Sequence, residues 1–108
     1  MPSYLVLGKY SKEGFATAVE EGFETRADAL RSSIEGLGGE LEMVYFCPAY
    51  SGHDFVFILT APSAEVVQMM SLAASTSAGI ADGGTVIELK TAAEVDAAVQ
   101  AMQQAAAQ

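Results

Sequence analysis

Cysteine, histidine and tryptophan are almost absent from this chain. Its 108 residues include one cysteine, one histidine and no tryptophan. A single cysteine excludes a disulfide within the chain, and a lone cysteine and histidine give no recognisable ligand spacing for a metal ion. The glycine pairs at 38–39 and 83–84 have neither the GxGxxG nor the P-loop spacing that cradles a nucleotide. We therefore expect no metal site and no cofactor.

Basic side chains are scarce too. Five Lys and Arg residues stand against 14 Asp and Glu residues, so the net charge is −9. Binding to nucleic acid depends on Lys and Arg clustered against phosphates, and anionic membrane surfaces attract the same side chains. The basic residues of this chain are scattered along it: Lys9, Lys12, Arg26, Arg31 and Lys90. We expect neither nucleic acid nor a membrane surface to be a partner.

Long hydrophobic runs are missing as well. No apolar run reaches the roughly 18 residues that a membrane-spanning helix needs. The first three residues lead directly into a strand-like segment, without the basic region and cleavable apolar stretch of a signal peptide. Together with the low cysteine content, these features predict a cytoplasmic protein.

Apolar residues are plentiful, since 51% of the chain is hydrophobic and only 18% is charged. A chain of this length and composition predicts one folded domain covering residues 1–108. Two short runs, residues 4–10 and 55–60, do not alternate apolar with polar positions. Strands of this kind are buried on both faces, so we expect both to lie in the middle of a sheet.

A helical stripe follows the first of these strands. Ser11 can cap a helix, and apolar residues then recur at spacings of three and four up to residue 37. Thr25 and Asp28 resemble a capping box. We therefore expect the better part of the helix to start at Arg26, after a short turn.

The middle of the chain predicts two more strands and a second helix. Strands are expected over residues 40–46 and 55–60, and Pro62 and Ser63 open a helix after them. Alternation along the earlier of these strands places three apolar residues on one face: Leu41, Met43 and Tyr45.

The last part of the chain predicts a strand and a helix. We expect the strand over residues 85–89, because Gly83 and Gly84 break its start. Thr91 and Glu94 form a capping box for the helix, and the tail from about residue 104 is expected to fray. Four residues of this helix are expected to face inward: Val95, Ala98, Val99 and Met102.

The resulting order of elements predicts the fold class, α+β with a ferredoxin-like four-stranded antiparallel sheet. Split crossovers place the helices on one face and make the first and third strands central. The other face would then be bare and apolar, so we expect a second copy to cover it. The sequence thus predicts a homodimer through the sheet face, a dimeric α/β barrel, with Phe57 of the third strand facing the partner.

Several motifs of the chain resemble the GYD-domain family of small dimeric-barrel proteins, whose function is poorly defined. The tripeptide that names the family, Gly-Tyr-Asp, reads Gly52-His53-Asp54 here. The resemblance implies the fold and the dimer but no reaction. It covers most of residues 4–74 and rests on Tyr4-Leu5-Val6-Leu7-Gly8-Lys9-Tyr10-Ser11-Lys12-Glu13-Gly14, Leu37-Gly38-Gly39-Glu40, Ser51-Gly52-His53-Asp54 and Ile58-Leu59-Thr60-Ala61-Pro62-Ser63.

The loop from Cys47 to Asp54, before the third strand, is expected to form one wall of any pocket, and it contains three of the candidate ligand-binding residues. Histidine titrates near neutral pH and a carboxylate can orient it, although the aspartate can equally cap the loop. Tyrosine hydroxyls can donate hydrogen bonds to a ligand carbonyl, and tyrosine rings can stack on an aromatic ligand. Alternatively, the rings simply pack at the rim of the barrel. The candidates are Tyr10, Tyr45, Tyr50, His53 and Asp54. Cys47 is more readily interpreted as an inert thiol.

Three functions remain open at the level of sequence. The first is a binding or accessory module for a small apolar or aromatic molecule. The second is a cofactor-independent oxygenase, isomerase or decarboxylase acting on an aromatic or quinone-like metabolite, in which His53 relays a proton and Tyr10 or Tyr45 steadies an enolate. The third is a structural or protein-interaction role. A pocket enclosing His53 and two tyrosines would distinguish the enzyme from the other two.

Overall fold

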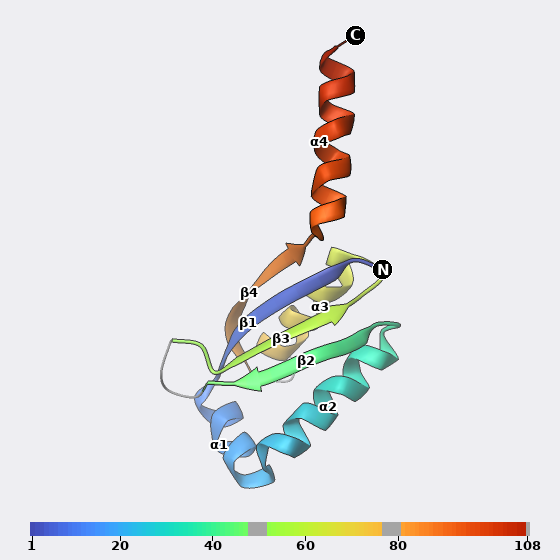
Figure 1. Cartoon of the computed structure of the whole chain (residues 1–108). Helices are drawn as coiled ribbons and strands as arrows, with labels where there is room; N and C mark the ends of the chain where they lie inside the picture. The colour runs from blue at the N-terminus through green and yellow to red at the C-terminus, as the bar shows by residue number, and fades with distance from the viewer. Residues whose placement is uncertain (48–51, 77–80, 108) are drawn as a thin grey trace.

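The structure, a computed structural model, describes residues 1–47, 52–76 and 81–107. Within these segments, strands and helices are interspersed along the chain, and Figure 1 labels each of them. Their order is β1 (Ser3–Tyr10), α1 (Lys12–Glu21), α2 (Phe23–Gly36), β2 (Glu40–Phe46), β3 (Phe55–Thr60), α3 (Ala64–Ser75), β4 (Ala81–Leu89) and α4 (Ala92–Ala106).

The strands form one antiparallel sheet in the order β2-β3-β1-β4. The ferredoxin-like α+β prediction is therefore confirmed, including the central positions of β1 and β3. These two strands pair from Ser3 opposite Thr60 to Gly8 opposite Phe55. No helix of the described segments is both long and apolar enough to cross a membrane.

Short hydroxyl side chains start three of the helices, as the sequence predicts. Ser11 Oγ accepts the N–H of Gly14 at 2.9 Å before α1, and Ser63 caps α3 in the same way. Before α4, Thr91 and Glu94 form a reciprocal capping box. Each cap satisfies N–H groups that a helix leaves without an internal partner.

The start of α2 differs from the prediction. It begins at Phe23, directly after Gly22, and the segment before it is the separate helix α1 instead of a short turn. Gly22 has a φ of 98°, which side-chain-bearing residues rarely adopt, and this bend divides the helical stripe in two. The expected start at Arg26 and the capping box at Thr25 and Asp28 are therefore wrong.

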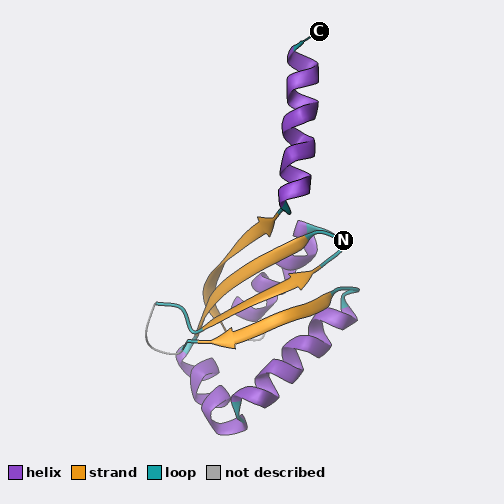
Figure 2. Ribbon diagram, viewed as in Figure 1, coloured by secondary structure: helices purple, strands orange, loops and turns teal. Residues whose placement is uncertain are grey.

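The main core lies between the sheet and the two longer covering helices. Its buried members include Tyr4 and Val6 of β1, Leu59 of β3, Ile34 of α2 and Val67 of α3. Since both helices contribute to one cluster with the same side of the central strands, α2 and α3 cover one face of the sheet, which we call the helix face (Figure 2).

A bulge in β2 changes the expected pattern of its two faces. Leu41 pairs with Leu59, but Met43 pairs with Ile58, so the register shifts between them. An extra residue at a bulge reverses the alternation of side chains. Leu41 therefore belongs to the helix face, whereas Met43 and Tyr45 belong to the other face, and the prediction that all three share one face is wrong.

The strand β4 is longer than predicted. It starts at Ala81, so Gly83 and Gly84 lie inside it instead of breaking its start. Gly84 pairs with Gly8 of β1, and a Cβ at Gly84 would lie 2.8 Å from the carbonyl oxygen of Leu7. Glycine lets these two backbones approach closely. In the sequence alone, the glycine pair indicated a break at the start of the strand instead.

The face of the sheet opposite α2 and α3 has no covering layer among the described residues. We call it the open face. Phe57 does not belong to it, because this residue is 4% exposed within the core cluster, so the expectation that Phe57 faces a partner is wrong. The residues next to it in β3 face the other way. By strand register, the apolar members of the open face are Leu5, Leu7, Met43, Tyr45, Val56, Ile58, Ile87 and Leu89.

The helix α4 projects away from the rest of the molecule (Figure 1). None of residues 92–106 is buried, and Val95, Val99 and Met102 are 49%, 39% and 65% exposed. The expectation that these side chains and Ala98 face inward is therefore wrong within this chain. The helix also continues to Ala106, through the start of the tail that the sequence predicts to fray.

Candidate functional site

A cavity of about 760 Å³ opens on the helix face between α2 and α3. Its position follows from where the two helices pack: α2 lies against β2, and α3 lies against β4. Because β2 and β4 are the two edge strands, both helices sit over the margins of the sheet. The cavity therefore lies over the middle of the helix face, between the two helices, and we call it the interhelical groove.

The floor of the interhelical groove is apolar and is shaped by a close contact between the central strands. Val6 and Gly8 of β1 and Phe55 and Phe57 of β3 contribute to it. A Cβ at Gly8 would clash with the ring of Phe55. The absence of a side chain at Gly8 therefore lets this ring lie across β1 and form part of the floor.

Aromatic rings continue from this floor around one end of the groove. All five phenylalanines of the chain and Tyr10 form one connected series of ring contacts. The closest pairs are Tyr10 with Phe55, whose centroids are 4.9 Å apart, and Phe23 with Phe46, at 5.0 Å. The series runs in the order Phe57, Phe55, Tyr10, Phe15, Phe23, Phe46. This end of the groove can stack against a flat apolar ligand.

Tyr10 and Arg26 supply polar groups at the same end. Burial raises the pKa of the Tyr10 phenol above its ordinary value, and the positive charge of the nearby Arg26 guanidinium partly offsets that rise. The phenol therefore stays protonated at neutral pH. Arg26 is largely shielded, with a side chain 20% exposed, and its Nη1 lies 3.7 Å from Glu21 Oε2. A phenol and a guanidinium together can receive an anionic oxygen.

Among the described residues that line the groove, the acidic one is Glu65 of α3, which lies far from Arg26. Arg26 lies beside Tyr10 at the end of β1, whereas Glu65 lies in the first turn of α3, which follows the end of β3. Because β1 and β3 are antiparallel, Arg26 and Glu65 lie toward opposite ends of the sheet. The groove is therefore polarised, with the cation at its aromatic end.

Asp54 has a structural position next to this site. It is 7% exposed, its Oδ2 accepts the N–H of Tyr10 at 2.9 Å, and its own N–H donates to Gly8 O at 2.7 Å. These bonds tie the end of β1 to the beginning of β3. The Asp54 carboxylate thus satisfies a backbone N–H of the neighbouring strand β1, whereas the sequence suggested a cap within its own loop.

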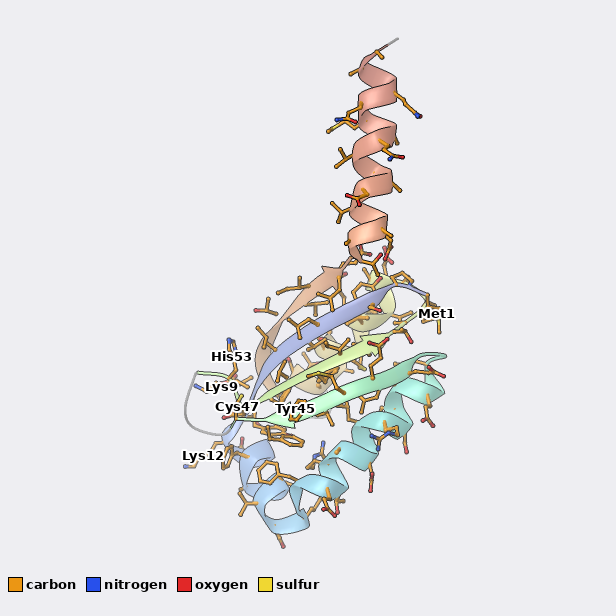
Figure 3. The ribbon with its side chains drawn as sticks, in the orientation of Figure 1. Met1, Lys9, Lys12, Tyr45, Cys47 and His53 are labelled. Carbon is orange, nitrogen blue, oxygen red and sulfur yellow. The ribbon has the colours of Figure 1, made fainter. Side chains whose placement is uncertain are left out.

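His53 is half-buried next to Asp54 and lies at the same end of the sheet as Lys9 and Cys47 (Figure 3). The Cys47 thiol donates to His53 O at 3.4 Å. None of the described residues of the loop, which are Cys47 and residues 52–54, lines the interhelical groove. A ligand-binding role for His53 and Asp54 stays a prediction.

The other two candidate tyrosines are not brought to the groove in the described segments. Tyr45 is 65% exposed and belongs to the open face, so it and Tyr10 lie on opposite faces of the sheet. Tyr50 lies outside the described residues. The combination of His53 with two tyrosines in one pocket, which would indicate an enzyme, is not present among the residues that the structure describes.

Sequence reasoning missed Arg26 and the phenylalanine series. Arg26 lies three residues after Phe23 and four before Leu30, so it flanks the apolar stripe of α2. The sequence signal that could have identified Arg26 is a single basic residue next to the apolar stripe of a helix. The phenylalanines come from β2, β3 and both N-terminal helices, and no sequence pattern places them together.

The described lining of the interhelical groove is mostly apolar. In the described segments, no group of three or more His, Cys, Asp or Glu side chains could hold a metal ion. What the groove offers is apolar surface, stacked rings and a phenol–guanidinium pair. Pockets with mostly apolar walls and few polar groups are typical of ligand sites.

Comparison with known proteins identifies the family. The GYD domain matches the chain over residues 4–104, which is nearly its whole length. Comparison with curated proteins gave no significant match. The matched residues include the described strands apart from Ser3, and every described residue that lines the interhelical groove. The chain therefore belongs to the GYD domain family.

Proposed function

We propose that this protein is a small-molecule-binding module whose ligand occupies the interhelical groove. The single observation that carries the proposal is the apolar cavity of about 760 Å³ between α2 and α3. Ligand pockets are typically about 300–1,000 Å³, and their polar groups are few and placed at specific points. The cavity has the volume and the composition of such a pocket.

The ligand class follows from the polarity of the groove. Aromatic rings in contact with one another and apolar walls favour a flat or elongated hydrophobic body. Arg26 and Tyr10 together favour an anionic oxygen at one end of that body. Glu65, at the far end, disfavours a second negative charge. We therefore assign the groove to an amphipathic monoanion, such as an aromatic carboxylate or a phenolate.

A homodimer through the open face is the second part of the proposal. Its support is the row of apolar side chains on central strands, which includes Leu5, Leu7, Val56 and Ile58, with no covering layer in this chain. Contiguous apolar patches of this kind mark interaction sites in water-exposed proteins. The groove lies on the opposite face of the sheet, so each chain of the dimer keeps its own ligand site accessible.

Blocking the groove tests ligand binding directly. Ala74 of α3 lines it, and a phenylalanine there would occupy part of the cavity. We expect wild-type protein isolated from its own host to retain a small molecule in native mass spectrometry, and the Ala74→Phe protein to be recovered empty.

The matched control is Gln68→Phe, an exposed position of the same helix outside the groove lining. This variant should keep the bound molecule. Retention of the same molecule by folded Ala74→Phe protein, at the wild-type ratio, would contradict binding in the groove.

A further inference from the structure

The helix α4 projects as an arm, and none of its residues is buried in its own chain. The Cα radius of gyration is 16.5 Å, whereas a compact chain of this length has about 13 Å. The molecule extends 60 × 30 × 23 Å, and the long axis includes the projecting helix (Figure 1). The arm, defined as residues 92–106, therefore accounts for the departure from a compact shape.

The arm carries one apolar stripe. Val95, Val99 and Met102 are spaced by four and three residues, so they share one side of the helix. All three are exposed in the single chain. Asp96 and Ala97 lie away from this stripe by the same geometry. A stripe of this kind is typical of a helix that packs against another apolar surface.

The sequence at the start of α4 favours a helix, but it does not provide an apolar surface against which the helix can pack. The Thr91 hydroxyl and the Glu94 carboxylate each accept a backbone N–H of the other at 3.1 Å. A well-capped helix of 15 residues is nevertheless marginal in water when it is isolated. Stable helix formation along residues 92–106 therefore depends on tertiary or quaternary packing.

The connection to β4 directs the arm away from its own sheet. Only Lys90 separates the end of β4 at Leu89 from the N-cap residue Thr91, whose backbone is extended. The Lys90 ammonium is also paired with Glu88 of β4 at 3.0 Å. A connection this short continues the direction of the strand, and a return over the chain's own sheet would require a reversal that these residues do not make.

We propose that α4 packs its Val95–Val99–Met102 stripe on the second copy of this chain, at the margin of the stacked open faces. This inference rests on the proposed dimer and adds an exchanged arm to it. The occupant is the second copy because the arm leaves the sheet directly after Leu89, which belongs to the open face, so its exposed stripe starts at the edge of the proposed interface. In a two-fold dimer each chain provides one arm and receives one.

The areas involved support this arrangement. Four strands at a spacing of about 4.8 Å give the open face roughly 450 Å² of projected area. One side of a helix of this length adds roughly 200 Å² on the same projected measure. The arm therefore enlarges the apolar surface available to the interface by nearly half.

A matched pair of charge substitutions in α4 tests the exchange. Val99→Asp places a charge in the stripe, while Ala97→Asp places the same charge on the opposite side of the same helix. We expect Val99→Asp to raise the dimer dissociation constant at least tenfold in sedimentation equilibrium. Ala97→Asp should change it by less than about threefold.

The chain on which the arm packs is measured in the wild-type protein. In a dimer mixed from ¹³C-labelled and unlabelled chains, isotope-filtered NOE spectra should show contacts from the methyl groups of Val95, Val99 and Met102 to the other chain. Contacts only within one chain, or none, overturn the exchange while the dimer itself stands. A wild-type protein that is monomeric at micromolar concentration overturns both.

Discussion

Ile58→Glu should convert the proposed homodimer into folded monomers. Ile58 lies in the middle of central strand β3, pairs with Leu5 and Met43, and belongs to the open face. In a dimer that stacks two such faces, the carboxylate would be buried without a partner, which costs about 3–5 kcal/mol. The dissociation constant should therefore rise at least a hundredfold. Sedimentation velocity over a concentration series measures this change.

The control for this substitution is Thr17→Glu, which adds the same charge at an exposed position of α1. This variant should remain dimeric, which separates burial of charge from the general effect of a more negative chain. Circular dichroism of both variants checks that the sheet persists. A folded Ile58→Glu protein with the wild-type dissociation constant would exclude the open face as the interface.

Arg26→Met should weaken the binding of an anionic aromatic probe in the interhelical groove by about ten- to a hundredfold. The probe is 8-anilinonaphthalene-1-sulfonate, whose rings can stack on the aromatic end while its sulfonate meets Arg26. Hydrogen bonds to charged groups contribute about 1.5–3 kcal/mol, which sets the expected loss of affinity. Methionine keeps much of the apolar stem, so the shape of the groove should change little. Fluorescence titration gives the affinity.

Two comparisons make this measurement specific. The uncharged analogue N-phenyl-1-naphthylamine should bind wild-type and Arg26→Met protein within about threefold, because it has no anionic group. Glu21→Gln removes the carboxylate 3.7 Å from Arg26 and should leave the sulfonate affinity unchanged or higher. If Arg26→Met lowered the affinity for both probes equally, this residue would shape the groove without recognising charge.

The fold could be predicted to a large extent because its signals are local. The strand boundaries at residues 40–46 and 55–60 and the caps at Ser11, Ser63 and Thr91 are where the pattern places them. Apolar runs on both faces correctly indicated that β1 and β3 are central. Caps and strand alternation depend on residues a few positions apart, so a sequence pattern contains them directly.

The errors have non-local causes. The bulge between Leu41 and Met43 reverses the faces of β2 and depends on how β2 pairs with β3. Gly84 continues β4 because it lies opposite Gly8, 76 positions earlier in the chain. The orientation of Phe57 follows from the same register, since a shift of one residue exchanges the two faces of a strand.

By itself, the sequence determined the α+β class, the order of the strands along the chain, the capped starts of α1, α3 and α4, and the acidic character of this protein. Only the tertiary structure decided that α2 and α3 sit over the two edge strands, that the interhelical groove opens between them, and that Arg26 meets Tyr10 at its aromatic end. It also decided that α4 leaves the molecule with its apolar stripe exposed. The physical reason is that local patterns fix which side of each element is apolar. Which surface each side meets depends on strand pairing between residues distant in sequence.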